Sequence, residues 1–181
     1  MASGFVSLIG AGPGDPDLLT VKAVRRLRQA HVVLYDALID PRVLRLAERA
    51  SRRLVGGRAG ACHDQAAINT LMVDLASAGA RVVRLKGGDP FIFGRGGEEA
   101  RALAQAGVPF EVVPGVSSAT AAPALAGIPL THRGVASGFV VITGHSAAGW
   151  TSLLRGLAPG TLTLVVLMGL GARAPLVDAL A

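Results

Sequence analysis

The sequence has little cysteine, few aromatic side chains and no long apolar run, and each shortage excludes a class of protein. Cys62 is the single cysteine in 181 residues, which excludes an internal disulfide and a cysteine-based zinc site. Aromatic residues make up 4% of the chain, which argues against the stacking platforms that bind single-stranded nucleic acid. No apolar run approaches the ~20 residues that span a bilayer, and residues 1–12 lack the basic start of a signal peptide. We therefore expect a cytoplasmic protein without a membrane partner.

Acidic residues are outnumbered by basic ones. There are 12 Asp and Glu against 18 Lys and Arg, sixteen of them Arg, and the net charge is +6. Such a balance favours an acidic partner, and Arg suits the planar, bidentate capture of carboxylates. Most of the arginines before residue 54 fit a solvated helix surface better than a binding face. No basic block is long enough for a nucleic-acid tail, so nucleic acid is not an expected partner.

The most informative stretch runs from Lys86 to Glu99 and contains five glycines between Gly87 and Gly97. It follows a short apolar run, 82–85, that is typical of a buried parallel strand. Open α/β sheets bind their ligands at the carboxyl ends of such strands. Glycine lets a ligand approach the backbone closely, and Asp89 offers two acceptors. The stretch therefore favours a pocket for a small ligand with hydroxyls or an ammonium over an ordinary strand-to-helix loop.

The first loop, Gly10–Thr20, follows a predicted strand at 5–9 and partly matches a dinucleotide fingerprint. Asp15 stands where the third glycine of that motif should be, and two prolines prevent the loop from running straight into a helix. No Gly-Lys-Ser/Thr follows, which excludes a P-loop. This loop therefore favours a ligand without phosphates. Asp36 stands at the end of a second predicted strand, where it is either a capping residue or a catalytic base.

Alternating strand and helix patterns predict an α/β fold with a parallel sheet and helices on both faces. Thr20 can cap a helix that carries Val21, Val24 and Leu27 on one face. Pro114-Gly115 is the candidate hinge, so the expected domains are 1–114 and 115–181. The second has two long apolar strands, 138–143 and 161–168, and the start of a helix. It is shorter than an ordinary domain, so we expect an incomplete second α/β domain.

Several motifs then occur in one order along the chain: GAGPGDPDLLT at 10–20, YD at 35–36, VVRLKGGDPFIFGRGGEE at 82–99, VPGVSS at 113–118, GIPLTHR at 127–133, TGH at 143–145 and MGL at 168–170. This set closely resembles the tetrapyrrole methylases, and within them the uroporphyrinogen-III C-methyltransferases. The likeness covers nearly all of the chain. The run from Arg84 to Glu99 is far more specific than a lone glycine pattern.

The resemblance implies an enzyme that transfers two methyl groups from S-adenosylmethionine to carbons 2 and 7 of uroporphyrinogen III. The products are S-adenosylhomocysteine and precorrin-2, which leads to sirohaem and cobalamin. It also implies two α/β domains, usually in a homodimer, and no metal. Asp36 falls on the position assigned as proton acceptor. The cofactor contacts map onto Pro13, Gly87, Gly88, Asp89, Ile92, Ser117, Ser118 and Met168. Because the substrate carries eight carboxylates, Arg58, Arg95 and Arg133 are candidates for binding it.

Two departures from the family pattern leave alternatives open. Gly57 stands where the family has a lysine assigned as proton donor, and the neighbouring Arg58 would be a poor acid. The family sequence also continues beyond residue 181. A shortened, weakly active or inactive member that only binds cofactor or tetrapyrrole is therefore the first alternative. A nicotinamide-dependent oxidoreductase is the second, and Asp15 with the two prolines of the first loop argues against it.

Overall fold

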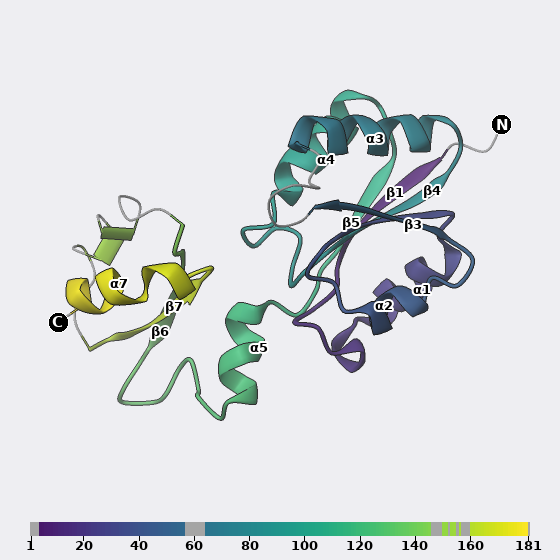
Figure 1. Cartoon of the computed structure of the whole chain (residues 1–181). Helices are drawn as coiled ribbons and strands as arrows, with labels where there is room; N and C mark the ends of the chain where they lie inside the picture. The colour runs from purple at the N-terminus through teal and green to yellow at the C-terminus, as the bar shows by residue number, and fades with distance from the viewer. Residues whose placement is uncertain are drawn as a thin grey trace. The chain divides into compact units, whose positions relative to one another are not determined.

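The computed structural model describes residues 4–56, 64–145, 150–151, 153–154, 156 and 160–180 (Figure 1). Contacts within the chain divide it into two compact units, Met1–Ser117 and Ser118–Ala181. Each unit is described by itself. The domain boundary predicted between residues 114 and 115 stays a prediction. The division by contacts falls three residues later, between Ser117 and Ser118.

The first unit contains a five-stranded parallel sheet in the order β3-β2-β4-β1-β5. Ile9 on β1 pairs with Leu85 on one side and with Val113 on the other. Apolar clusters lie on both faces of the sheet, as expected for parallel strands covered by helices. The strands are β1 (Phe5–Gly10), β2 (Val32–Asp36), β3 (Ser51–Gly56), β4 (Arg81–Lys86) and β5 (Phe110–Val113).

Helices cover both faces of this sheet (Figure 1). One apolar cluster joins the sheet to α1 and α2, and a second joins its other face to α3 and α4. The α/β fold with helices on both faces is therefore confirmed. The helical elements are η1 (Pro16–Leu18), α1 (Val21–Gln29), α2 (Pro41–Arg45), α3 (Gln65–Ser77) and α4 (Gly96–Gln105).

The start of α1 confirms one expectation and corrects another. Thr20 is the N-cap, and its hydroxyl accepts a hydrogen bond from Ala23 N at 3.1 Å. Leu27 is buried as predicted, but Val21 is 71% exposed and Ala23 takes the inward position of the first turn. The apolar spacing of Val21 with Val24 and Leu27 was misleading, because the buried face of the helix begins only at Ala23. Small side chains can fill such a stripe where the helix approaches the sheet.

The second unit contains α5 (Ser118–Leu125), the parallel strands β6 (Gly138–Thr143) and β7 (Leu162–Leu167), η2 (Leu170–Ala172) and α7 (Arg173–Leu180). Its described core is built on Ile142, Trp150 and Leu176. Both apolar strands predicted here are present, the second one residue shorter at each end. None of the described helices is both long and apolar enough to cross a bilayer.

Candidate functional site

Three glycines bring the carboxyl ends of β1, β4 and β5 into close contact. A Cβ atom built on Gly10 would lie 2.4 Å from Gly88 O and 2.6 Å from Gly115 Cα. Gly12 and Gly88 form a bridge in which each amide donates to the other's carbonyl, at 3.2 and 2.8 Å. These approaches leave no room for a side chain at Gly10 or Gly115. The two glycine-rich loops noted in the sequence therefore meet at one edge of the sheet, where open α/β sheets bind ligands.

Asp89 holds this group of loops together. Its Oδ1 accepts a hydrogen bond from Phe91 N at 2.8 Å, and its Oδ2 accepts one from Gly115 N at 3.1 Å. The carboxylate thus joins its own loop to the residues after β5. Each oxygen retains acceptor capacity for a ligand, because a carboxylate has about four lone-pair positions. Gly87 is exposed, and a Cβ built on it would meet nothing within 4 Å. The backbone at Gly87 therefore faces open space.

Asp36 ends β2, the neighbour of β4 in the sheet, and a register shift sets its position. Tyr35 pairs with Leu54 on β3, whereas Asp36 pairs with Gly56. Such a bulge re-aims a side chain and is common beside active sites. A Cβ built on Gly56 would lie 2.0 Å from Asp36 Oδ1, so a larger residue there would displace the Asp36 carboxylate. The carboxylate consequently packs directly against the β3 backbone.

A buried network of charged groups extends from Asp36 into the sheet. Arg84 Nη2 donates to Asp36 Oδ1 at 2.6 Å, and Arg84 Nε donates to Glu99 Oε1 at 2.9 Å. Lys86 Nζ and Gln65 Nε2 donate to the same Glu99 oxygen, at 3.0 and 3.3 Å. The side chains of Arg84, Lys86 and Glu99 are 2%, 5% and 0% exposed, whereas that of Asp36 is 27% exposed. Among its charged members, Asp36 is thus the one that reaches the surface.

Burial also changes the titration of Lys86. Desolvation, with a further contribution from the charge of Arg84, lowers the pKa of Lys86 below its ordinary value, and Glu99 opposes this shift. Among the described residues, Glu99 Oε2 has no hydrogen-bond partner. The interior thus holds two cations, Arg84 and Lys86, and one anion, Glu99, and the partly exposed Asp36 supplies the fourth charge.

The sequence reading missed Arg84, Lys86 and Glu99 as site residues, although a signal was present. Arg84 and Lys86 occur at alternate positions of an otherwise buried strand, so they share one face. Charged groups on a buried strand face are paired with opposite charges. The pattern therefore predicts an anion on the helix that covers that face. Glu99 is that anion, in the first turn of α4, which begins at Gly96.

The other predicted residues of the first unit lie around the same strand ends. Pro13 follows Gly12 in the first loop, and Ile92 is 40% exposed. Ser117 is buried at the end of the unit. Arg95 is exposed in a left-handed conformation (φ 58°) just before α4, and it makes two hydrogen bonds to Glu98, at 2.8 and 2.7 Å.

The second unit carries Ser118, Arg133 and Met168. Ser118 is the first residue of α5, and Arg133 is exposed. Met168 follows β7 with a left-handed backbone (φ 56°), which is uncommon for a residue with a side chain. The neighbouring Gly169 packs against Gly144, whose Cβ would lie 2.5 Å from Gly169 Cα. Strain of this kind occurs where function holds a residue in place. Arg58 and Gly57 lie outside the described residues.

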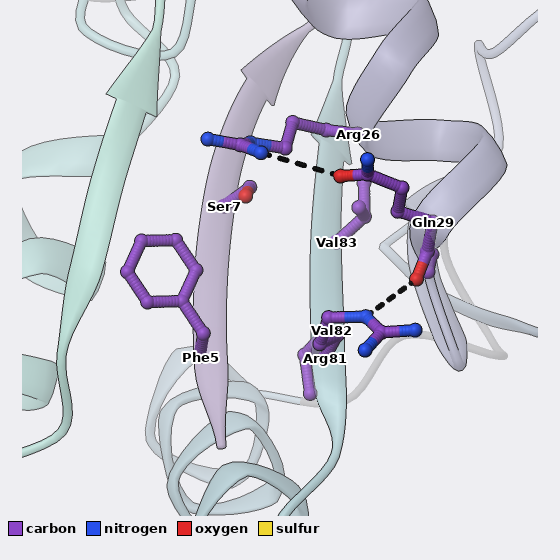
Figure 2. Close-up of a pocket in the computed structure, with 8 residues that line it drawn as sticks. Phe5, Ser7, Arg26, Gln29, Arg81, Val82 and Val83 are labelled. Carbon is purple, nitrogen blue, oxygen red and sulfur yellow. Dashed lines mark hydrogen bonds between the residues drawn. The ribbon is translucent and has the colours of Figure 1, made fainter. Parts of the chain in front are cut away.

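A pocket of about 260 Å³ lies at the opposite end of the strands. Figure 2 shows the first residues of β1 and β4 and the last turn of α1 around it. Arg26 donates to the Gln29 side chain at 3.2 Å, and Arg81 donates to the Gln29 carbonyl at 2.8 Å. None of the site residues predicted from the sequence is among those that line this pocket within the described ranges. Because these are the amino ends of parallel strands, we do not assign the candidate site here.

The parallel sheet and the glycine-packed strand ends define an α/β protein that presents its loops at the carboxyl edge of the sheet. Residues 6–181 match the family described as Tetrapyrrole (Corrin/Porphyrin) Methylases. The chain therefore belongs to the tetrapyrrole methylase family, which confirms the resemblance seen in the motifs.

Individual relatives agree with this assignment. A siroheme synthase of Pseudomonas paraeruginosa (strain DSM 24068 / PA7) is 56% identical over 174 residues, which is 94% of this chain. The chain spans 37% of the length of that synthase. A uroporphyrin-III C-methyl transferase of Thermus thermophilus, solved with S-adenyl homocysteine, is 51% identical with a TM-score of 0.82, and covers 98% of this chain and 75% of its own. A cobalt precorrin-4 methyltransferase is 29% identical with a TM-score of 0.82, covering 97% and 73%.

Proposed function

We propose that this chain transfers methyl groups from S-adenosylmethionine to carbons 2 and 7 of uroporphyrinogen III and so forms precorrin-2. The observation that carries the proposal is the meeting of the glycine-packed loops and the Asp36 carboxylate at the carboxyl ends of adjacent strands. The Thermus relative is a uroporphyrin-III C-methyl transferase and the Pseudomonas relative a siroheme synthase. Both names support this substrate and a role in sirohaem or cobalamin synthesis.

The loops at the strand ends fit S-adenosylmethionine as the methyl donor. The ligand has a ribose, an ammonium and a sulfonium but no phosphate, which agrees with a glycine-rich site that lacks a P-loop. The open space at Gly87 lets a ligand contact the backbone directly, and the retained acceptor capacity of Asp89 suits hydroxyl or ammonium donors. We assign cofactor contacts to Pro13, Gly87, Gly88, Asp89, Ile92, Ser117, Ser118 and Met168, and expect S-adenosylhomocysteine as product.

The remaining roles concern the tetrapyrrole. When bound, the cofactor supplies the methyl group, and the chain's own residues align the acceptor carbon and exclude water. Asp36 is the proposed proton acceptor, because its carboxylate is held in place and is partly exposed. Arg95 and Arg133 are exposed cations suited to substrate carboxylates, and Arg58 keeps that assignment from the sequence.

An anaerobic incubation with uroporphyrinogen III and S-adenosylmethionine tests the proposal, read by mass spectrometry of the tetrapyrrole. We expect products with one and two added methyl groups. Asp36→Asn should lower turnover by about 10²–10⁴-fold, the usual contribution of a general base, while S-adenosylhomocysteine affinity in calorimetry stays close to that of the parent. No added methyl from folded protein would refute the activity. Binding of S-adenosylhomocysteine without transfer would identify the chain as a member that only binds cofactor.

Assembly and location complete the proposal. The family resemblance supports a homodimer in the cytoplasm, with no nucleic-acid or membrane partner and no metal. Light scattering on the purified chain checks the dimer, because a monomeric mass at micromolar concentration contradicts it.

A further inference from the structure

The charge of Lys86 is by itself enough to balance that of Glu99. Lys86 Nζ lies 3.0 Å from Glu99 Oε1, and both side chains are buried. Arg84 brings a second buried cation to the same oxygen, at 2.9 Å from its Nε. A buried cation needs an anion of its own, and Asp36 is the carboxylate that Arg84 reaches with Nη2. The four charges therefore balance only with the Asp36 carboxylate in place.

The same contacts fix the orientation of Asp36. A guanidinium is a rigid planar fork, so anchoring its Nε on Glu99 also fixes where its Nη2 lies. Nη2 holds Asp36 Oδ1 at 2.6 Å, and the backbone at Gly56 lies close to the same oxygen. Within the described part of the chain, Oδ2 of Asp36 accepts no hydrogen bond. One oxygen of the carboxylate is thus held while the other is left for a further proton donor.

We propose that Arg84 is a positioning residue for methyl transfer: anchored by Glu99, it holds Asp36 Oδ1 so that Oδ2 accepts the proton released by the methylated substrate. This inference rests on the proposed function. The substrate C–H or N–H bond breaks, its electron pair stays in the ring system, and the proton forms an O–H bond on Oδ2. Loss of that proton to water restores the carboxylate. The absence of a side chain at Gly56 leaves room for the carboxylate in this position.

The first test removes one charge of each sign. Arg84→Met with Glu99→Gln leaves Asp36 and Lys86 as a balanced pair, so this variant avoids an unpaired buried Glu99. We expect kcat to fall about 10²-fold, as for a misplaced catalytic group, with little change in KM or in S-adenosylhomocysteine affinity. Arg84→Lys keeps the charge without the planar fork and should recover part of that loss. An unchanged kcat in the double variant would overturn the inference.

A double-mutant cycle separates positioning from general damage. In an Asp36→Asn background, Arg84→Met with Glu99→Gln should lower kcat by a further factor of less than about three, because Arg84 acts through Asp36. Equal losses in both backgrounds would overturn the inference. The matched control removes another ion pair of the first unit, Arg26→Met with Glu111→Gln, at the amino end of the strands. We expect this control to lower the melting temperature while kcat is retained.

A measurement that does not need turnover keeps the two proposals apart. The Arg84 Nε and Nη protons should be protected from exchange in ¹⁵N–¹H spectra, and Asp36→Asn should alter the Nη signals more than the Nε signal. If the parent transfers no methyl group, the proposed function fails, and these spectra still decide whether Arg84 holds Asp36. Rapidly exchanging Nη protons in the parent would overturn that contact.

Discussion

Replacing Gly10 with alanine should open the contact between the three strand ends. The added methyl would lie 2.4 Å from Gly88 O and 2.6 Å from Gly115 Cα, where ordinary contacts begin at 3.4 Å. Every atom in the way belongs to the backbone, so no side chain can rotate aside. The loops must separate by about 1 Å, and overpacking of this kind costs about 1–3 kcal/mol. The Gly12–Gly88 bridge would be lost as well, at about 1 kcal/mol for each of its hydrogen bonds.

We therefore expect Gly10→Ala to destabilise the first unit by about 3–5 kcal/mol and to lower its melting temperature by about 10–20 °C. S-adenosylhomocysteine affinity should fall at least about tenfold, because the displaced loops include the proposed contacts at Gly87 to Asp89. Differential scanning calorimetry and titration calorimetry measure the two effects. The control is Gly97→Ala: its methyl meets nothing within 4 Å, and alanine favours the helix by about 0.5–1 kcal/mol. Equal melting temperature and affinity in Gly10→Ala and the parent would refute the described packing.

Three further predictions follow from other contacts. Gly87→Ala should leave the melting temperature nearly unchanged, because its Cβ meets open space, yet weaken S-adenosylhomocysteine binding; equal affinity would move the ligand away from this loop. Asp89→Ala should weaken the same binding several-fold and also destabilise the first unit by about 1–3 kcal/mol, since two backbone amides lose their acceptor; urea unfolding that matches the parent would contradict this. Glu111 is partly buried, which raises its pKa, but hydrogen bonds from Arg26, Lys22 and Ser7 outweigh burial and lower the pKa from 4.5 to about 2. The stabilisation that the Glu111 carboxylate gives the first unit is thus fully present above pH 4.5 and is lost as the pH falls towards 2. Because its cationic partners are substantially exposed, we expect this stabilisation to be about 1–2 kcal/mol. Glu111→Gln should remove it, and urea unfolding curves measured across this pH range check the loss.

The sequence was sufficient for the order of strands and helices, because apolar periodicity and the Thr20 cap are local signals. It also identified both glycine-rich loops and the position of Asp36. It could not identify the partner of Asp36: Arg84 stands 48 positions away and reaches it only because β2 and β4 are neighbours in the sheet. The bulge that places Gly56 against Asp36 depends on the register of two strands, which residue spacing does not determine.

Sheet order also determines when the first unit can form during synthesis. β1 pairs with β4 and β5, whose residues begin at Arg81 and Phe110. At about 5–20 residues per second, Gly10 leaves the ribosome roughly 5–20 s before Gly115 does. During that interval the apolar segment Phe5–Gly10 has both edges unpaired, a state prone to aggregation. The arrangement that gathers three strand ends at one edge therefore makes the nascent chain depend on protection until most of the first unit has been translated.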